Sequence, residues 1–190
     1  MQLYTLLLLC IVLLSVTGAS APACDALGMR RWHAAFFAVS ILALSRFTVL
    51  LKPECSINFG ALLLPLFPAR RALKEGARFG AWAVLLLFAA LGVALSRLGG
   101  LYGAENGLLS GLAAGCGALL LCDTPCLALG VAAAAPLLQA AITMCVDMLA
   151  KGYGALDISG SAVLNAQVVA VCFGALLLCL FAVRAPLRQE

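Results

Sequence analysis

The sequence predicts an all-α, polytopic membrane protein: a bundle of about six or seven transmembrane helices. The first observation is composition, since 65% of the 190 residues are hydrophobic and 11% are charged, with a mean hydropathy of +1.13. Soluble domains are roughly 45–50% apolar and about 25% charged. The second observation is length, because each crossing needs about 20 apolar residues. We therefore expect one integral membrane domain over residues 1–190.

The basic residues do not indicate a nucleic-acid partner. The net charge of +4 reflects twelve Lys and Arg against eight Asp and Glu, and the basic residues fall mostly between apolar runs. In that position they set the orientation of a membrane protein. The expected partner is therefore the lipid bilayer.

Catalytic and metal-binding patterns are absent from the sequence. Most of the nine cysteines lie inside apolar runs, where a thiol packs as a small hydrophobe. The turn Cys122–Cys126 brings together two thiols and a carboxylate, but a structural zinc site needs four ligands. His33 is the single histidine and is expected to anchor the chain at the membrane interface. No hydrolase, P-loop or zinc-protease motif occurs. We therefore expect no cofactor or metal, and the sequence disfavours an enzyme.

Seven apolar runs are the expected spans. They cover residues 3–16, 33–51, 57–67, 79–96, 106–121, 126–150 and 158–183. The third run rises only about 16 Å as a helix, roughly half of the hydrocarbon core, so it is expected to be a short or re-entrant span. The first run has a signal-peptide alternative, because Ala19-Ser20-Ala21 matches a cleavage pattern. Its lack of a basic leading segment favours an uncleaved helix.

The basic residues favour seven crossings. With the N-terminus outside, eight of them lie on the inner side and three on the outer side. The inner ones are Arg30, Arg31, Arg70, Arg71, Lys74, Arg78, Arg184 and Arg188, and the outer ones are Lys52, Arg97 and Lys151. If 57–67 did not cross, the cluster at 70–78 would lie outside, against the positive-inside rule. We expect a bacterial plasma-membrane protein with a cytoplasmic C-terminus.

Three glycines lie on one face of the fifth run. Gly107, Gly111 and Gly115 are four residues apart, a spacing that allows another helix to approach closely. The favoured interpretation is a packing seam within the chain, against the alanine-rich stretch 132–135. The alternative is a contact face of a homo-oligomer or of a larger membrane complex.

The sixth run carries a polar stripe. Gln139, Thr143, Asp147 and Lys151 follow at four-residue steps and therefore share one helix face. Asp147 is the one acid inside a predicted span. Two interpretations remain open: an ion pair with Lys151, or a functional acid.

Polar residues from other segments lie at the same predicted depth, in the outer half of the membrane. They suggest an outward-facing pocket for a small solute, in which Arg46 would pair with Asp147. The candidate lining residues are Asp147, Asn165, Gln139, Asn58 and Arg46. In the alternative interpretation Arg46 snorkels outward and the amides bridge helices.

Three segments carry a family resemblance. Ser56–Pro65 is similar to S-[IV]-N-[IVL]-G-G-A-x-[IL]-P, Met144–Leu149 to I-G-A-D-L-L, and Leu156–Asn165 lies where I-G-G-A-G-V-F-D-G is expected. In order and spacing they resemble an uncharacterised prokaryotic multi-pass membrane family, the domain of unknown function 1614. The resemblance implies a polytopic inner-membrane protein of no established activity.

The resemblance draws attention to Asn58 and Asp147, which match family positions. The second acid of the family falls at Asn165 in this chain. Intramembrane aspartyl chemistry needs two carboxyl groups that share a proton, and here Asp147 faces only an amide, so proteolysis is not expected. The leading hypothesis is a protein that binds or passes a small solute through the polar pocket. The alternative is a structural or assembly subunit that uses the glycine face.

Overall fold

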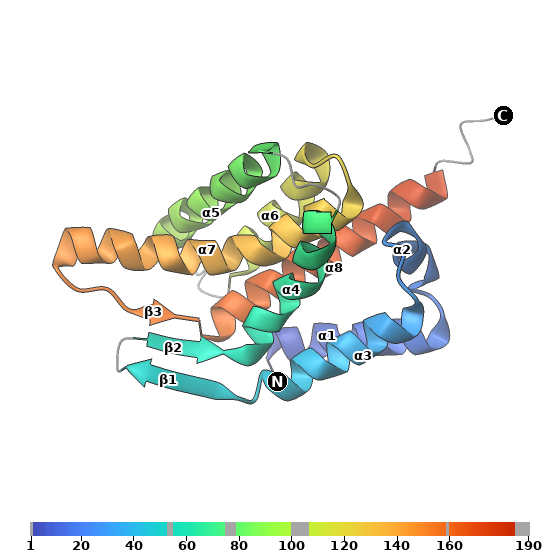
Figure 1. Cartoon of the computed structure of the whole chain (residues 1–190), viewed down its shortest axis with the longest axis horizontal. Helices are drawn as coiled ribbons and strands as arrows, with labels where there is room; N and C mark the ends of the chain where they lie inside the picture. Colours follow the sequence, from blue (N-terminus) through green and yellow to red (C-terminus); the bar gives the residue numbers. More distant parts are fainter. Residues whose placement is uncertain (1, 53–54, 75–78, 100–106, 159, 185–190) are drawn as a thin grey trace.

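The computed structural model describes residues 2–52, 55–74, 79–99, 107–158 and 160–184 (Figure 1). Within these ranges the chain is mostly helical, as predicted, with eight helices and three short strands. The helices are α1 (Leu3–Thr17), α2 (Ala21–Ala26), α3 (Arg31–Leu44), α4 (Phe59–Lys74), α5 (Phe79–Gly99), α6 (Leu108–Leu121), α7 (Pro125–Lys151) and α8 (Ser161–Arg184). The strands are β1 (Thr48–Lys52), β2 (Cys55–Asn58) and β3 (Leu156–Asp157).

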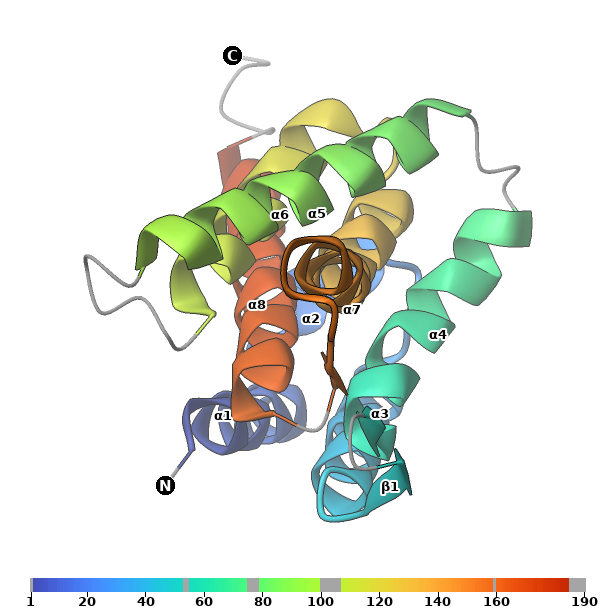
Figure 2. The ribbon, with the colours of Figure 1, turned by 90° about the vertical axis from the view of Figure 1, so that its left-hand side faces the viewer.

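Helix α7 lies at the centre of the bundle. Figure 2 shows it nearly end-on, with α4, α5 and α8 around it, and α6 also packs against it. Its middle is rich in alanine, and Ala132, Ala133 and Ala135 are at most 2% exposed. Because these side chains are small, the neighbouring helices approach the α7 backbone closely.

The glycine face of α6 packs against α8 of the same chain. A Cβ atom at Gly111 would lie 2.5 Å from the carbonyl oxygen of Ala166. Cβ atoms at Gly107 and Gly115 would meet the α8 carbonyl oxygens one turn before and one turn after it. Only glycine leaves room for this approach, so the three glycines form a packing seam within the chain.

The partner in this seam differs from the one expected. The alanine-rich stretch 132–135 contacts a different face of α6, where Ala114 and Ala118 share a buried cluster with Ala132. The glycines instead meet alanines of α8 that have the same four-residue spacing, at positions 162, 166 and 170. Two matching rows of small residues therefore hold α6 against α8.

Gln167 joins three helices inside the bundle. Its side chain is 0% exposed, and its Nε2 donates to the carbonyl oxygens of Ala61 in α4 (3.0 Å) and Ala133 in α7 (2.8 Å). The α7 acceptor lies in the turn before Pro136, a proline inside the helix that interrupts the regular backbone bonding. A buried amide with two backbone acceptors fixes the spacing of α4, α7 and α8.

Helices α1 and α3 form a second layer beside α8 and α4 (Figure 1). Tyr4 and Leu8 of α1, Ile41 of α3 and Leu164 of α8 belong to one buried cluster. This cluster contains more large aliphatic and aromatic side chains than the alanine-rich cluster between α6, α7 and α8. It joins α1 and α3 to the rest of the bundle.

A small three-stranded sheet lies at one end of the bundle (Figure 1). Strand β1 pairs with β2 antiparallel, and β2 pairs with β3 parallel, so that Ser56 lies opposite Asp157. The sequence predicts helix alone here, with one span over 33–51, and this expectation is wrong. Helix α3 ends at Leu44 and the chain continues into β1.

Helix α3 ends where α4 crosses it. A Cβ atom at Gly60 would lie 3.0 Å from the carbonyl oxygen of Ile41, so the two backbones nearly touch. The carbonyl oxygen of Ser45 accepts a hydrogen bond from Asn58 Nδ2 at 2.9 Å. In a continuing helix it would accept one from a backbone N–H of the next turn. Beyond this point residues 48–52 gain backbone hydrogen bonds by pairing with β2.

Among the described residues, three helices are long and apolar enough to cross a membrane, over Gly80–Arg97, Pro125–Lys151 and Ser161–Phe181. Helices α1, α3 and α6 are apolar but have 15, 14 and 14 residues, which rise only about 21–23 Å. The third apolar run, 57–67, lies mostly in α4, which has 16 residues and continues to Lys74. Six or seven crossings are therefore not confirmed.

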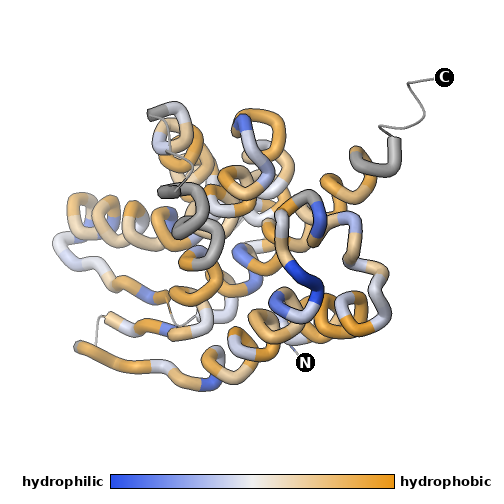
Figure 3. Tube along the Cα trace, turned by 45° about the vertical axis from the view of Figure 1, so that its right-hand side comes forward, coloured by the Kyte–Doolittle hydropathy of each residue, from blue (hydrophilic) through white to orange (hydrophobic). Residues whose placement is uncertain are grey.

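Large apolar side chains cover the outer surface. Leu149 is 89% exposed, Phe36 75% and Leu120 72%. Figure 3 shows hydrophobic residues along most of the helices. Soluble proteins rarely expose such extensive apolar surface, so the exterior suits lipid and fits a membrane protein.

The long helices run back and forth between two ends. One end holds the sheet, the C-terminal ends of α3, α5 and α7, and the starts of α6 and α8, and we call it the sheet end (Figure 1). The opposite end holds α2, the start of α3 at Arg31 and the end of α8 at Arg184. The functional features described below all lie at the sheet end.

Gly111→Ala is expected to destabilise the protein, because the added methyl group would push α6 away from Ala166. We expect a loss of about 1–3 kcal/mol in the free energy of unfolding, the usual cost of overpacking, measured by denaturation of the purified protein. Gly80→Ala is the matched control, since a Cβ there meets no atom within 4 Å. Equal effects at the two positions would contradict the seam.

Candidate functional site

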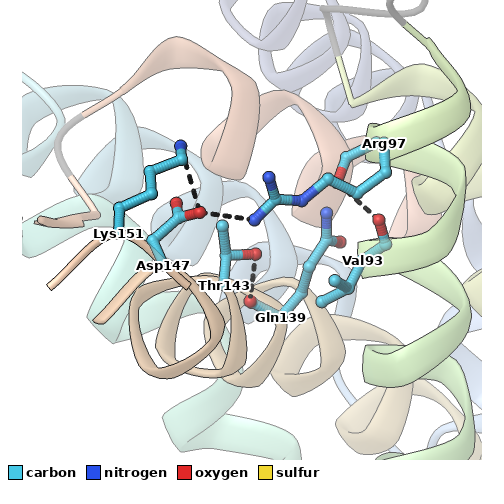
Figure 4. Close-up of polar contacts among 7 residues, drawn as sticks. Val93, Arg97, Gln139, Thr143, Asp147 and Lys151 are labelled. Atoms are coloured by element: carbon cyan, nitrogen blue, oxygen red, sulfur yellow. Dashed lines mark hydrogen bonds and ion pairs between the residues drawn. The ribbon is translucent and has the colours of Figure 1, made fainter. Parts of the chain in front are cut away.

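The polar stripe predicted on α7 faces α5. Figure 4 shows Gln139, Thr143, Asp147 and Lys151 along one side of the helix, with Arg97 reaching toward them. The Thr143 hydroxyl donates to the carbonyl oxygen of Gln139 at 2.9 Å. The stripe lies in the part of α7 that leads to the sheet end.

Asp147 binds two basic side chains. Its Oδ1 lies 2.6 Å from Nη2 of Arg97 and 3.2 Å from Nζ of Lys151. The Lys151 contact is the ion pair expected from the four-residue spacing, whereas the Arg97 contact joins α7 to α5. Both basic residues occupy the last turn of a helix, where the helix dipole favours a positive charge. We call these three residues the ion cluster.

A cavity of about 260 Å³ lies beside the ion cluster, between α5, α6, α7, α8 and β3. Its wall is partly apolar, and the described residues contribute five polar side chains to it. These are Ser96, Ser110, Gln139, Thr143 and Asp157. Ser96 is next to Arg97 in the chain, and Thr143 lies one turn before Asp147, so the ion cluster borders the cavity.

Gln139 connects two walls of the cavity. Its Nε2 donates to the carbonyl oxygen of Gly92 in α5 at 3.1 Å. A Cβ atom at Gly92 would overlap the Gln139 amide, so the glycine makes room for this contact. The bond fixes the distance between α5 and α7 at the level of the cavity.

Asp157 contributes a carboxylate from the sheet. Its Oδ1 accepts hydrogen bonds from the Ser56 hydroxyl at 2.7 Å and from the backbone N–H of Gly160 at 3.0 Å. The parallel pairing of β2 with β3 places Ser56 opposite Asp157. The sheet therefore positions a charged side chain on the cavity wall.

Two predicted pocket residues cap helices instead. Asn58 Oδ1 accepts from the backbone N–H of Gly60 at 2.8 Å, and Asn165 Oδ1 accepts from that of Tyr4 at 2.9 Å. Amides in the first turn of a helix have no partner within the helix, so these side chains complete the starts of α4 and α1. Neither is among the described residues that line the cavity.

Arg46 is not brought to Asp147. It is exposed in the connection between α3 and β1, and Asp147 pairs with Arg97 and Lys151. Of the predicted pocket residues, the structure places Gln139 on the cavity wall and Asp147 at its border.

Sequence reasoning does not identify Ser96, Arg97, Ser110 or Asp157 as site residues. Arg97 ends an apolar run, which indicates an interfacial cation but not its partner. Ser110 and Asp157 share a site only because α6 and α8 are neighbours. These residues can therefore be assigned to the site only once it is known which helices pack together.

The turn Cys122–Cys126 leads into α7. Within the described ranges, no group of three or more His, Cys, Asp or Glu side chains is arranged to hold a metal ion. Cys126 Sγ donates to the carbonyl oxygen of Leu27 at 3.6 Å. Thr124 Oγ1 accepts from the N–H of Leu127 at 3.3 Å, so the turn serves as the cap of α7.

No protein-family model, curated protein or solved structure matches the chain. The cavity and the ion cluster are therefore the features from which we infer function.

Arg97→Gln is expected to lower the melting temperature more than Lys151→Gln does. The Arg97 contact, at 2.6 Å, joins two helices, whereas Lys151 contacts Asp147 within one helix at 3.2 Å. In an Asp147→Asn background, Arg97→Gln should have little further effect, because the pair is already lost. If Arg97→Gln lowers the melting temperature as much in the Asp147→Asn background as in the original chain, the Arg97–Asp147 pair contributes nothing to stability.

The Cys122 thiol is expected to react slowly with maleimide near pH 7. Burial, and after it the nearby Asp123 carboxylate, raises the pKa of this thiol, and the thiolate is the reactive form. Asp123→Asn removes the negative charge and should lower the pKa and speed labelling at a given pH. The measurement is the rate against pH in a chain with Cys122 as its single cysteine. An unchanged profile in Asp123→Asn would rule out the electrostatic contribution.

Proposed function

We propose that the protein is a multi-pass bacterial plasma-membrane protein that binds or passes a small polar solute at the cavity between α5, α6, α7 and α8. The observation that carries this proposal is the cavity of about 260 Å³, with polar side chains from α5, α6, α7 and the sheet. Polar groups between membrane helices are costly and tend to mark functional sites. The polar lining therefore favours a binding role over simple packing.

In the proposed topology the sheet end faces outward and the opposite end faces the cytoplasm. Arg30 and Arg31 precede and begin α3 at the opposite end, where α8 also ends. Basic residues concentrate on the cytoplasmic side of membrane proteins, so the C-terminus would be cytoplasmic and the solute would enter from outside. The shorter helices would cross where the bilayer is locally thinned.

Gln139 and Thr143 are the proposed contact residues, because both lie on the cavity wall and on the α7 stripe. Asp147 is proposed to act from the border. By binding Arg97 and Lys151, it would join α5 to α7 beside the cavity. The other polar candidates, Asn58 and Asn165, would support the helices rather than contact the solute.

An assembly-subunit role is the alternative proposal. A contact at the glycine face would have to displace α8, because a side chain at Gly111 would already meet Ala166. A homo-oligomer or larger complex would therefore use another part of the surface. The proposed kinship with the domain of unknown function 1614 is compatible with either role.

Thr143→Cys, in a chain whose other cysteines are replaced, is expected to react with a membrane-impermeant thiol reagent in intact cells. The physical reason is that a solute cavity at the sheet end must be open to external water. Ala133→Cys is the matched control on the same helix, because Ala133 is 0% exposed. It should react only after denaturation.

The proposal fails if Thr143→Cys is folded and expressed yet reacts only after denaturation. Labelling in inverted vesicles but not in intact cells would leave the cavity in place and reverse the topology.

A further inference from the structure

We infer that the cavity takes a small uncharged molecule that combines a hydroxyl or amide group with an apolar portion. This inference rests on the proposed function, since it names the class of solute that would bind at the same site. Three features of the cavity support it: the balance of charge around it, the hydrogen-bonding groups on its wall, and its size.

The formal charges beside the cavity cancel. Asp157 lies on the wall, where two hydrogen bonds hold its carboxylate at the sheet. At the border, Arg97 and Lys151 both contact Asp147. Among the described residues that line or border the cavity, these groups amount to two negative and two positive charges. A charged solute would therefore lose its hydration without gaining a net charge of opposite sign, which is costly.

The helix termini around the cavity also offset one another. Of the four helices that enclose it, α6 and α8 start at the sheet end, and α5 and α7 end there. A helix start carries roughly half a positive charge and a helix end roughly half a negative one. The helix dipoles therefore favour neither a cation nor an anion, and an uncharged solute fits this surrounding best.

The hydroxyl groups on the wall present hydrogen-bond acceptors. Ser96 Oγ donates to the carbonyl oxygen of Val93 at 2.8 Å. The hydroxyl groups of Ser110 and Thr143 donate to carbonyl oxygens of their own helices at 3.0 and 2.9 Å. A hydroxyl has one proton and two lone pairs, so each group uses its proton within its helix and offers lone pairs to a solute. A solute that donates hydrogen bonds matches these groups.

The start of α6 adds hydrogen-bond donors. Gly107 caps this helix without a side-chain acceptor, and it lines the cavity together with Leu109 and Ser110. The first backbone N–H groups of a helix have no partner within the helix. A hydroxyl or amide group both donates and accepts, whereas an ether only accepts and an ammonium only donates. A hydroxyl or amide therefore matches both parts of the wall.

The rest of the wall is apolar and limits the size of the solute. Leu95, Pro136 and Val163 belong to it. The cavity measures about 260 Å³, and a cavity of about 150 Å³ holds one benzene molecule. A ring with a short polar arm fits this space, and the ring would contact these apolar side chains.

The test measures how well ring compounds of similar size protect Leu95→Cys from an uncharged methanethiosulfonate reagent. Position 95 lies on the wall, and the change leaves the three hydroxyl groups in place. The full chain, with its native cysteines replaced, is purified into lipid nanodiscs so that both faces are accessible. The compounds are benzyl alcohol, which is uncharged and donates, anisole, which is uncharged and does not donate, benzylamine as a cation and benzoate as an anion.

Benzyl alcohol should protect position 95 at a concentration about tenfold lower than the other compounds, because each of them leaves polar or charged groups unpaired. Ser110→Ala or Thr143→Val removes one acceptor and should weaken protection by benzyl alcohol about fivefold, the usual contribution of one hydrogen bond. Ser40→Ala is the matched control. The Ser40 hydroxyl also donates within its own helix, at 2.9 Å in α3, but is not among the described residues that line the cavity, so protection should not change.

Protection by benzylamine or benzoate equal to that by benzyl alcohol would show that the charge is not balanced, and would overturn the inference. Equal protection by anisole, or unchanged protection in folded Ser110→Ala and Thr143→Val variants, would show that the hydroxyl groups do not select the solute and would also overturn it. So would labelling that none of the compounds slows. Each of these results leaves an open cavity in place. If position 95 reacts only after denaturation, the cavity is closed to solutes and the proposed function fails as well.

Discussion

Close approach between helix backbones is the constraint on which this structure depends. Lipid tails are as apolar as leucine side chains, so helices in a membrane gain little from burying apolar surface and associate through direct packing. The glycines of α6 and the alanines of α7 and α8 make that packing possible. Gly107 and Ala166 belong both to the α6–α8 seam and to the wall of the cavity. The contacts that hold the bundle together therefore also set the distance between the cavity walls.

The polar side chains of the bundle have two distinct roles. Asn58, Asn165 and Gln167 bond to backbone groups at helix starts or near a proline, and these bonds determine where helices begin and how far apart they lie. Ser96, Thr143 and their neighbours line the cavity. Gln139 does both, since it lies on the wall and bonds to the α5 backbone. Position along the bundle does not separate the two groups, because residues at the same level face different neighbours.

The features that could be predicted from the sequence depend on spacing within one helix. The α7 stripe and the contact between Asp147 and Lys151 follow from the four-residue period, and the helix positions follow from the apolar runs. Helix partners could not be predicted, because α7 and α8 both offer small residues to the glycines of α6. The sheet was not predicted because residues 48–52 continue an apolar run, and hydropathy alone does not separate a short apolar strand from part of a helix. The Arg97 contact depends on the pairing of α5 with α7 and has no local signal.

The sheet end is joined by contacts between distant parts of the chain. Ser56 and Asp157 are 101 residues apart, and Tyr4 and Asn165 are 161 residues apart. During synthesis neither contact can form until the start of α8 has left the ribosome. The earlier helices are therefore synthesised while the α7 stripe is not yet enclosed and the first turn of α1 lacks its cap. Because α8 forms part of the cavity wall, the cavity cannot be complete until this last helix has been made and has packed.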